Sequence, residues 1–447
     1  MSLTPSVLAR LEALVGAERV RTAAACTARF AIGEVPPAAV VEPATLEEAA
    51  AVVAFAGREG LALVPWGQGT QMHLGGLPRR YDLALSLAAL QRLVEYDAAN
   101  LTLTAEAGLP LREVYRATLP QRQFLPLGFP GTAASLGGLL VTNTSGVKRL
   151  RYGSLRDLVL GVRVALPDGA LVRFGGRVVK NVAGYDMNKL FIGSLGAFGV
   201  VLEATYRLAA LPEENQALVA IFPALAAAAA AAAAVRRSPL LPSALLLLDA
   251  AAAATCPPLQ SLPIRDGEVL WVLDVDGTHE AVARQLRDGK AICETHGARE
   301  TAVLGGEALL ALWAWGEAWR APQANAAERF GLRLGLLPSA LATTLPQLPA
   351  PPGGRLAWLA DYPHGQVLAH VALPEAVSAP QVQAWLQQVR TAVSAQAGYC
   401  VVEHAPAALR RQLDLWGEVR GASLLRRYKQ QFDPQGVLNP GRTAADL

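Results

Sequence analysis

Three segments of the chain combine glycine with small hydroxyl or amide side chains, and the first follows a predicted strand. It reads PWGQGTQMHLGG over residues 65–76, directly after LALV. Gly67 and Gly69, beside Thr70 and Gln71, allow successive backbone N–H groups to converge on an anion without obstruction from Cβ atoms. The segment therefore fits a pyrophosphate cradle, although a plain glycine-rich turn after a strand satisfies the same pattern.

The second segment, GTAASLGGLLVTNTSG over residues 131–146, has few bulky side chains. Its main chain can approach a flat ligand closely, and its hydroxyl groups can hydrogen-bond to that ligand. These hydroxyl groups belong to Thr132, Ser135, Thr142, Thr144 and Ser145. Tight packing of one loop against another explains the same composition, so both interpretations stay open.

The third segment, KNVAGYDMNKLFIGSLGAFG over residues 180–199, carries a GxxGxxG pattern at Gly193, Gly196 and Gly199. A nicotinamide-binding Rossmann unit requires GxGxxG and a helix after it, whereas a strand is predicted here. The sequence therefore excludes that fingerprint. It also contains no GxxxxGK phosphate loop, no HExxH zinc motif and no GxSxG nucleophile elbow.

Histidine and cysteine are too scattered to form a metal site. The six histidines lie far apart, and the four cysteines form no CxxC pair. We therefore expect no metal, no disulfide framework, and surface or satisfied core positions for the histidines. The tryptophans at 313, 315 and 319 are expected in the core. The basic residues of the C-terminal helix favour a solvated face, with a subunit contact as the alternative; they are Arg410, Arg411, Arg420, Arg426, Arg427 and Lys429.

The elements around these segments follow from apolar periodicity. A strand at VVEP, a helix capped by Thr45 and ended by Gly60, and a strand at LALVP precede the first segment. DLALSL and LTLTAEAG alternate as half-buried strands do, and LREVYRATL predicts a short helix. Residues 155–174 predict a β-hairpin that turns at Pro167-Asp168-Gly169, and VVLEATYRL (200–208) predicts a strand with a second, polar face.

Length and composition limit the class of protein. The 447 residues suggest two to three domains, and 52% apolar with 17% charged residues indicate globular packing. A net charge of +3 without a block of like charge speaks against nucleic acid as a partner. The N-terminus does not resemble an export signal, and no apolar window is long enough to span a membrane. These features fit a cytoplasmic protein.

A change in composition near residue 210 predicts a domain boundary. Beyond it, alanine-rich stretches predict helices, while EVLWVLDVDG and GQVLAHVAL predict strands. The expected fold class is α+β. Its expected parts are an N-terminal helical segment, a first α+β domain, an alanine-rich α+β domain and a C-terminal helical segment, at residues 1–32, 33–210, 211–385 and 386–447.

Taken in order, the segments from Val41 to Leu208 resemble the FAD-binding domain of the vanillyl-alcohol oxidase and p-cresol methylhydroxylase (PCMH) superfamily. The similarity lies in VEPATLEEAAAVVAFAGREGLALVPWGQGT, SLGGLLVTNTSGVKRLRYGSLRDLVLGVRVALPDGALVRFGG and KNVAGYDMNKLFIGSLGAFGVVLEATYRL. The resemblance implies two α+β subdomains that hold FAD, a separate cap domain, and a C-terminal segment that returns to the flavin. FDPQGVLNPG (432–441) resembles that returning segment.

The resemblance also assigns cofactor-binding residues. Around the pyrophosphate it places Trp66, Gly67, Gln68, Gly69, Thr70 and Gln71. Along the flavin and ribityl chain it places Ser135, Gly138, Thr142, Ser145, Gly146 and Tyr152, with backbone contacts from Gly199 and Val200 and with Asn439 near the ring. Members that attach FAD covalently often carry a histidine where this chain has Thr70, so non-covalent FAD is expected.

Within the superfamily, KNVAGYDMNKLFIGSLGAFG and FDPQGVLNPGR resemble the E subunits of bacterial glycolate oxidase. Related D subunits usually read GSEG where this chain has GSLG, with Leu195 in place of glutamate. They also carry an HxGDGNxH-type motif for which DYPHGQVLAHV offers only His364 and His370. Besides these histidines, Arg320, Arg333 and Arg355 are candidates for binding the substrate, although ordinary structural roles fit each of them.

This likeness implies an FAD-dependent oxidoreductase acting on the CH–OH group of 2-hydroxy acids. The chain would be the FAD-binding subunit of a glycolate oxidase complex, beside a D-like catalytic flavoprotein and an iron–sulfur F subunit. It would assist assembly or electron transfer, in the cytoplasm or held at the inner membrane through its partners. Two alternatives stay open: a self-sufficient FAD-dependent D-2-hydroxyacid dehydrogenase, and a scaffold subunit that has lost FAD.

Overall fold

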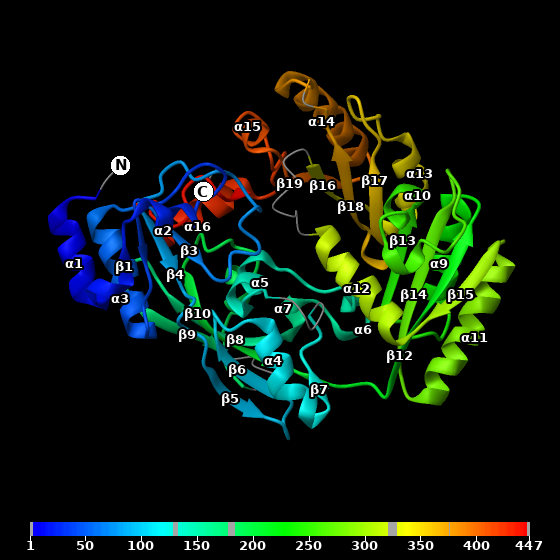
Figure 1. The fold of residues 1–447 in the computed structure, drawn as a ribbon, viewed down its shortest axis with the longest axis horizontal. Helices are drawn as coiled ribbons and strands as arrows, with labels where there is room; N and C mark the ends of the chain where they lie inside the picture. The colour runs from blue at the N-terminus through cyan, green and yellow to red at the C-terminus, as the bar shows by residue number, and fades with distance from the viewer. Residues whose placement is uncertain (1–2, 128–132, 178–183, 321–328, 375, 445–447) are drawn as a thin grey trace. The chain divides into compact units, whose positions relative to one another are not determined.

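The computed structural model describes residues 3–127, 133–177, 184–320, 329–374 and 376–444. The chain forms two compact units. The first unit comprises Met1–Ser145, Ser154–Leu211 and Val419–Leu447, and the second comprises Gly146–Gly153 and Pro212–Glu418. Each unit has its own sheets and its own apolar core (Figure 1).

The strands of the first unit form three sheets, ordered β1-β2-β4-β3, β5-β6-β10-β8-β9 and β11-β7. The first sheet contains β1 (Val20–Arg21), β2 (Ala39–Val41), β3 (Leu63–Trp66) and β4 (Leu83–Ser86). The second contains β5 (Leu93–Asp97), β6 (Thr102–Glu106), β8 (Val159–Ala165), β9 (Leu171–Gly175) and β10 (Val200–Arg207), and the third contains β7 (Gln123–Phe124) and β11 (Ala209–Ala210).

The helices of the first unit are short, apart from those near its two ends. They are α1 (Pro5–Val15), α2 (Ala24–Ala28), α3 (Leu46–Glu59), α4 (Leu111–Thr118), α5 (Leu136–Thr142), α7 (Leu155–Leu158), α8 (Asn188–Phe191) and α16 (Ala422–Phe432). The predicted helix α3 is confirmed with both of its ends. Thr45 caps its start by accepting the N–H of Glu48, and Gly60 ends it with a left-handed φ of 64°.

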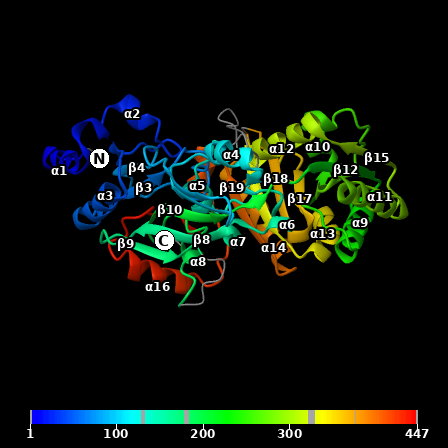
Figure 2. The ribbon, with the colours of Figure 1, turned by 90° about the horizontal axis from the view of Figure 1, so that it is seen from below.

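The predicted hairpin is confirmed as β8 and β9, which pair antiparallel with Val162 opposite Phe174 (Figure 2). The expectation of half-buried strands is wrong for β4 and β6, whose residues are all buried, and the polar face expected on β10 is buried at Glu203 and Thr205. The buried polar groups of β6 and β10 have partners: Thr104 and Thr205 hydrogen-bond to each other (2.9 Å), and the Tyr206 hydroxyl donates to the carbonyl of Leu136 in α5 (3.2 Å). Both faces of the sheet are therefore covered at β6 and β10, whereas the outer strands β5 and β9 are partly exposed.

The second unit is built on one antiparallel sheet of eight strands in the order β15-β12-β14-β13-β17-β18-β16-β19. Its strands are β12 (Glu214–Phe222), β13 (Ala244–Asp249), β14 (Val269–Gly277), β15 (Glu300–Leu304), β16 (Arg329–Gly335), β17 (Ala357–Asp361), β18 (Gln366–Ala372) and β19 (Tyr399–His404). Its helices are α6 (Arg149–Tyr152), α9 (Leu225–Arg237), α10 (Ala250–Ala253), α11 (His279–Thr295), α12 (Gly306–Arg320), α13 (Leu341–Thr344), α14 (Ala379–Ser394) and α15 (Ala407–Arg410).

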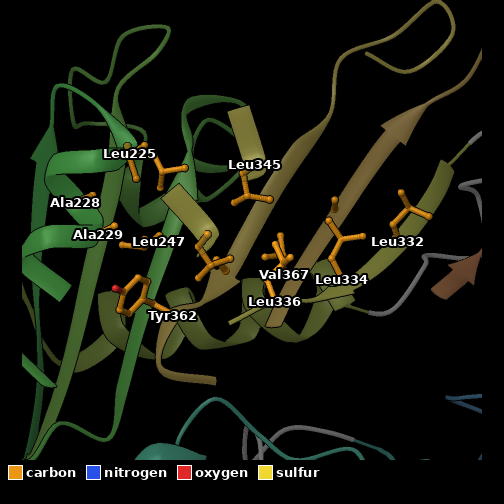
Figure 3. Packing of buried hydrophobic residues seen from close by; sticks show 14 of the residues in the cluster. Leu225, Ala228, Ala229, Leu247, Leu332, Leu334, Leu336, Leu345, Tyr362 and Val367 are labelled. Atoms are coloured by element: carbon orange, nitrogen blue, oxygen red, sulfur yellow. The ribbon is translucent and has the colours of Figure 1, made fainter. Parts of the chain in front are cut away.

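One face of this sheet carries the core of the second unit. Leucine and alanine side chains of α9 pack on it beside side chains from β13, β16 and β18; Figure 3 labels Leu225, Ala228, Ala229, Leu247, Leu334 and Val367 among them. The alanine-rich tract is thus a packed helix, as predicted. Trp313 and Trp319 of α12 are also buried, which confirms the core position expected for them.

A short strap of the chain, residues 146–153, leaves the first unit and belongs to the second. The Lys148 Nζ atom lies 3.0 Å from a carboxylate oxygen of Asp274 and 3.0 Å from one of Asp276, both on β14. Arg149 pairs with Asp361 of β17 at 2.8 Å. These ion pairs fasten the strap to the sheet face opposite the apolar core.

The C-terminal part of the chain divides differently from the segment 386–447 expected from sequence. Residues up to Glu418 belong to the second unit, because α14 packs on the edge strand β19, and Arg390 of α14 pairs with Asp414 at 3.0 Å. Only Val419–Leu447 belongs to the first unit, where Leu438 pairs in parallel with Leu63 of β3. A bilayer-spanning helix is absent from the described ranges, since none combines enough length with an apolar sequence.

Candidate cofactor site

A cleft that is partly open to solvent lies within the first unit. It is lined by the loop 65–72, by one face of α5, by residues 195–201 and by two residues near the C-terminus, Asn439 and Arg442. Because these stretches are far apart along the chain, the fold brings together what the sequence keeps separate. The lining consists largely of main chain and small side chains.

The first wall is the loop that follows β3. Trp66 is fixed at its start, since the indole N–H donates to the Tyr81 hydroxyl (2.6 Å), which donates to the carbonyl of Phe30 (2.9 Å). Burial raises the pKa of the Tyr81 phenol, so it remains a neutral donor. A Cβ atom on Gly67 would lie only 1.9 Å from the Ser135 hydroxyl oxygen. Glycine at 67 thus lets this loop approach the second wall.

The second wall is α5, the helix that begins after Ser135. The Ser135 hydroxyl caps the helix by accepting the N–H of Gly138, and Gly137 packs so closely on Ala107, the residue after β6, that a Cβ would lie 2.6 Å from the alanine side chain. The Thr142 hydroxyl donates to the carbonyl of Gly138 (2.8 Å). Its proton is therefore engaged within the helix, and toward a ligand this hydroxyl can act as an acceptor.

The third wall contains Leu195 and Gly196, both with φ in the left-handed region (51° and 75°). This conformation suits glycine and strains leucine, so the turn holds Leu195 against its backbone preference. Gly199 has another reason to be glycine. Its missing Cβ would lie 2.6 Å from a methyl group of Val164 on β8, so its small size serves packing against the sheet.

Asn439 supplies an unsatisfied acceptor at the cleft. Its side chain is buried, its Nδ2 donates to the carbonyl of Leu195 (2.5 Å), and its Oδ1 has no hydrogen-bond partner among the described residues. Buried acceptors normally have a donor. A cleft lined by main chain and provided with an unpaired amide oxygen fits a flat, N–H-bearing ring system such as a flavin.

The single charged residue among those lining the cleft is Arg442. Its guanidinium group donates to the carbonyls of Met72 (3.3 Å), Leu74 (2.9 Å) and Gly76 (3.4 Å), which fixes a positive charge behind the first loop. A fixed positive charge beside exposed N–H groups suits a pyrophosphate. Sequence reasoning did not single out Arg442, although it follows directly after the NPG of the returning segment.

Twelve of the fifteen residues expected around the cofactor line this one cleft. They are Trp66, Gly67, Gln68, Gly69, Thr70, Gln71, Ser135, Gly138, Thr142, Gly199, Val200 and Asn439. Parts of two of the small-residue segments, residues 131–132 and 180–183, lie outside the described residues.

Ser145, Gly146 and Tyr152 are not among the residues that line the cleft. The Ser145 hydroxyl is buried and accepts the N–H of Leu155 (2.8 Å), so it fixes the start of α7. Gly146 and Tyr152 belong to the strap of the second unit. There burial raises the pKa of Tyr152, and its hydroxyl interacts with Asp276. The physical reason is that the chain changes unit after Ser145.

Most of the side chains considered for substrate binding in the second unit are engaged in ion pairs. Arg333 pairs with Glu403 (3.0 Å), Arg355 with Asp266 (2.8 Å), and His364 with Asp361 (2.9 Å). The side chain of Arg320 lies outside the described residues. Among the described residues, no group of three or more histidine, cysteine or acidic side chains is placed to hold a metal ion.

His370 differs from these side chains. Burial lowers its pKa to about 4, so the imidazole is neutral near pH 7, and its Nδ1 has no hydrogen-bond partner among the described residues. Its ring packs edge-on against Trp319, with 4.9 Å between ring centroids. On β16, Gly331 lies opposite His370, so Arg329 and Arg333 share its sheet face, the one opposite the apolar core.

Two protein-family models match the chain. Residues 37–175 match the FAD binding domain, and residues 211–334 and 367–443 match the C-terminal domain of FAD linked oxidases. The chain is 29% identical over 427 residues to a D-2-hydroxyglutarate dehydrogenase from Xanthomonas citri pv. viticola, covering 91% of this chain and 89% of the relative. It is 33% identical over 192 residues to glycolate oxidase subunit GlcD from Bacillus subtilis, where the match covers 43% of this chain and 41% of the relative.

A solved structure supports the fold. The p-cresol methylhydroxylase structure with substrate bound superposes with a TM-score of 0.74 over 98% of this chain and 96% of that one, at 14% identity. This likeness shows the fold of the PCMH type. Together with the two family models and with the main-chain-lined cleft, it establishes that the chain belongs to the FAD-linked oxidoreductases with a PCMH-type FAD-binding domain.

Proposed function

We propose that the protein binds FAD non-covalently in the cleft of the first unit and uses it to oxidise the CH–OH group of a 2-hydroxy acid. The observation that carries this proposal is the convergence of the cleft walls, with Asn439 and Arg442 among them. When bound, FAD accepts the two electrons that leave the α-carbon of the substrate. The chain's own residues position the cofactor by close main-chain approach.

Non-covalent attachment is supported by the identity of the lining residues. None of the residues that line the described cleft is a histidine, and Thr70 stands in the pyrophosphate loop. Acid precipitation of the purified yellow protein tests this point: the flavin is expected in the supernatant. Flavin that stays with the precipitated polypeptide would contradict the proposal.

Within the second unit, we propose that His370 and Arg329 bind a 2-hydroxy acid, with His370 as the acceptor for its hydroxyl proton and Arg329 as the cation for its carboxylate. A neutral imidazole with a free nitrogen is suited to accept a proton, and Arg329 forms no ion pair among the described residues. His370→Asn keeps the size and removes the base. We expect kcat to fall about 100-fold or more with unchanged FAD content. His279→Asn, at an exposed histidine that pairs with Glu214, serves as the matched control.

The proposal also includes a role as one subunit of a larger complex. We propose that it is the FAD-binding subunit of a glycolate-oxidising complex, beside a D-like catalytic flavoprotein and an iron–sulfur subunit. The support is the resemblance of the motif KNVAGYDMNKLFIGSLGAFG to E subunits, while the glycolate oxidase relative GlcD is itself a D subunit. Purified alone, the protein should be yellow and turn over little glycolate, and co-expression with genes for the two partners should restore activity.

One observation favours a second candidate, a self-sufficient D-2-hydroxyacid dehydrogenase. The similarity to the D-2-hydroxyglutarate dehydrogenase extends over 89% of that relative, whereas the match to GlcD covers 41% of it. Assay of the isolated protein with glycolate, D-lactate and D-2-hydroxyglutarate and an artificial electron acceptor separates the two. Robust turnover by the isolated chain would overturn the subunit role and leave the cofactor assignment intact.

A scaffold that has lost FAD is the third possibility raised by the sequence, and the cleft counts against it. A pure scaffold has no physical need for main chain exposed on several converging walls or for an unpaired buried amide oxygen at Asn439. Flavin content after gentle purification decides the matter: a colourless protein that takes up no added FAD would support the scaffold.

A further inference from the structure

A buried lysine lies behind the cofactor cleft, on the inward face of α16. Lys429 is only 7% exposed and lies on α16 (Figure 1). The other basic residues of this helix, Arg426 and Arg427, are exposed. The expectation of a solvated basic face is therefore wrong for Lys429. Its ammonium group hydrogen-bonds within the first unit, and Lys429 is not among the residues that line the cofactor cleft.

The ammonium group of Lys429 joins two segments that are remote in sequence. It donates to the carbonyl of Ala197 at 2.8 Å and to the carbonyl of Leu438 at 2.7 Å. Ala197 lies in the turn 195–199, which forms the third wall of the cleft, and Leu438 precedes Asn439. One side chain thus fixes the distance between the third wall and the returning segment.

Asp433 completes this arrangement. Its carboxylate, 2% exposed, lies 2.7 Å from Lys429 Nζ and accepts the backbone N–H groups of Val437 (3.0 Å) and Leu438 (2.8 Å). The strand β3 holds the same turn from the other side, because the N–H of Leu63 donates to Val437 and the carbonyl of Leu63 accepts the N–H of Asn439. The turn 433–438 is therefore organised around a single ion pair.

Because burying the charges of Lys429 and Asp433 costs free energy, we infer that this ion pair has a positioning role. Burial lowers the pKa of Lys429, and the attraction to Asp433 does not fully offset that effect, so the charged state is maintained at an energetic cost. Buried ion pairs seldom stabilise a fold better than apolar side chains of similar size. The Lys429 ammonium group also hydrogen-bonds to the carbonyls of Ala197 and Leu438, which an apolar side chain cannot do.

We propose that Lys429 is a positioning residue for FAD: it seats the segment 429–442 against the third wall, so that seating of this segment and binding of the cofactor are thermodynamically coupled. FAD that contacts Asn439 and Arg442 binds only the seated state, and the apparent affinity falls with the seated fraction. The inference rests on the cofactor site and is independent of the substrate.

Substitution tests the coupling. Lys429→Met removes the donor but leaves Asp433 buried and unpaired, whereas Lys429→Met combined with Asp433→Asn removes both charges and eases folding. FAD titration of each apoprotein, followed by flavin fluorescence, should show a dissociation constant at least tenfold higher than wild type for both variants. Lys189→Met, at an exposed lysine paired with Asp186 (3.0 Å), should bind FAD within twofold of wild type.

The double variant separates positioning from charge balance. If Lys429 merely neutralises Asp433, the double variant binds FAD like the wild type, and the proposal is overturned. Thermal unfolding of each apoprotein, recorded alongside, identifies the folded fraction, and the dissociation constant is measured on that fraction alone. A wild type that binds no FAD would instead sink the cofactor assignment itself.

Hydrogen exchange on the unmodified protein gives an independent test that no folding defect can obscure. The amides of Val437 and Leu438 donate to Asp433, and that of Gly76 donates to the carbonyl of Arg442. Added FAD should slow exchange at these amides at least tenfold, and much less in α3, which does not line the cleft. Equal effects in both regions, or none in the segment 429–442, would contradict the coupling.

Discussion

Each of the two units encloses a lysine, and the two lysines have opposite acid–base behaviour. At Lys148 in the second unit, burial lowers the pKa, but attraction to Asp274 and Asp276 outweighs it and the pKa is raised. At Lys429 in the first unit, burial again lowers the pKa, and the single carboxylate of Asp433 does not compensate. For these two lysines, the number of neighbouring carboxylates decides whether the pKa of the amine is raised or lowered.

The difference also separates two uses of a buried cation. Lys148 binds mainly side-chain acceptors, the two aspartates and the amide oxygen of Asn215, and so fastens one element to a sheet. Lys429 binds main-chain carbonyls on two loops and so sets the geometry of a cleft. Loss of the first should reduce stability most, and loss of the second should reduce cofactor affinity most.

The largest effect is expected from Lys148→Met. Asp274 and Asp276 are fully buried and would lose their shared cation. Asp276 would keep its pair with Arg151 (2.9 Å), but Asp274 would be left uncompensated, which destabilises by about 3–5 kcal/mol. Urea unfolding, with the transition of the second unit followed by circular dichroism, measures this loss. Adding Asp274→Asn should recover part of it, because one uncompensated charge is removed. A loss below about 1 kcal/mol would break the distinction between the two lysines.

A smaller effect, on cofactor affinity, is expected from Gly76→Ala. The new Cβ would lie 2.2 Å from the carbonyl oxygen of Gly441, so the returning segment must move away from the first loop. We expect FAD to bind about tenfold more weakly, about 1.4 kcal/mol. Gly176→Ala is the control, since its Cβ meets no atom within 4 Å and its φ is ordinary. Equal FAD affinity in both variants would contradict the seating of this segment.

As pH rises into the alkaline range, the contributions of the two lysines to the free energy of unfolding should change in opposite directions. The raised pKa of Lys148 means that its stabilising charge is fully present below the ordinary lysine value of 10.5 and is lost as pH rises above it. The lowered pKa of Lys429 means that the folded state releases its proton first. Its contribution to stability therefore rises as pH increases through that lowered pKa toward 10.5.

Unfolding free energies measured between pH 8 and 11 test this contrast. The difference between wild type and Lys429→Met should grow toward pH 10.5, and the difference between wild type and Lys148→Met should shrink only above it. If the loss of unfolding free energy has the same pH dependence in both variants, the two lysines do not differ in the direction of their pKa shifts.

The smallest effect is expected from Lys189→Met. Lys189 is 45% exposed and pairs with Asp186, which is 48% exposed, so solvent screens the attraction. A change of roughly 0.5 kcal/mol or less in the free energy of unfolding is expected. A larger change in the free energy of unfolding would mean that the exposure of Lys189 does not make its ion pair weaker than those of Lys148 and Lys429.

The sequence predicted the cofactor cleft better than any other part of the molecule. Close approach of main chain demands small residues, and small residues leave a compositional trace, as at Gly67, whose Cβ would collide with Ser135. The helix α3 was also predictable, because its capping residue Thr45 and its terminal Gly60 act locally. Such features depend on neighbours in sequence.

Features that depend on distant partners were not predictable. Nothing near Tyr152 reveals that Lys148 meets two aspartates more than 120 residues later, which draws the strap into the second unit. Lys429 looks like any basic residue on a polar helix until Ala197 is placed beside it. Thr205 occupies a polar position in an alternating strand sequence, which predicts exposure to solvent. In the structure it is buried and hydrogen-bonds to Thr104 of another strand, which is also buried.

The order of segments along the chain has a consequence for biosynthesis. The cleft uses main chain from residues 65–72 and side chains at 439 and 442, and the long second stretch of the other unit lies between them in sequence. A ribosome must therefore translate the whole of that stretch before the last wall of the cleft exists. A nascent polypeptide stalled before residue 429 should not retain flavin, so binding of FAD is confined to the end of translation or after it.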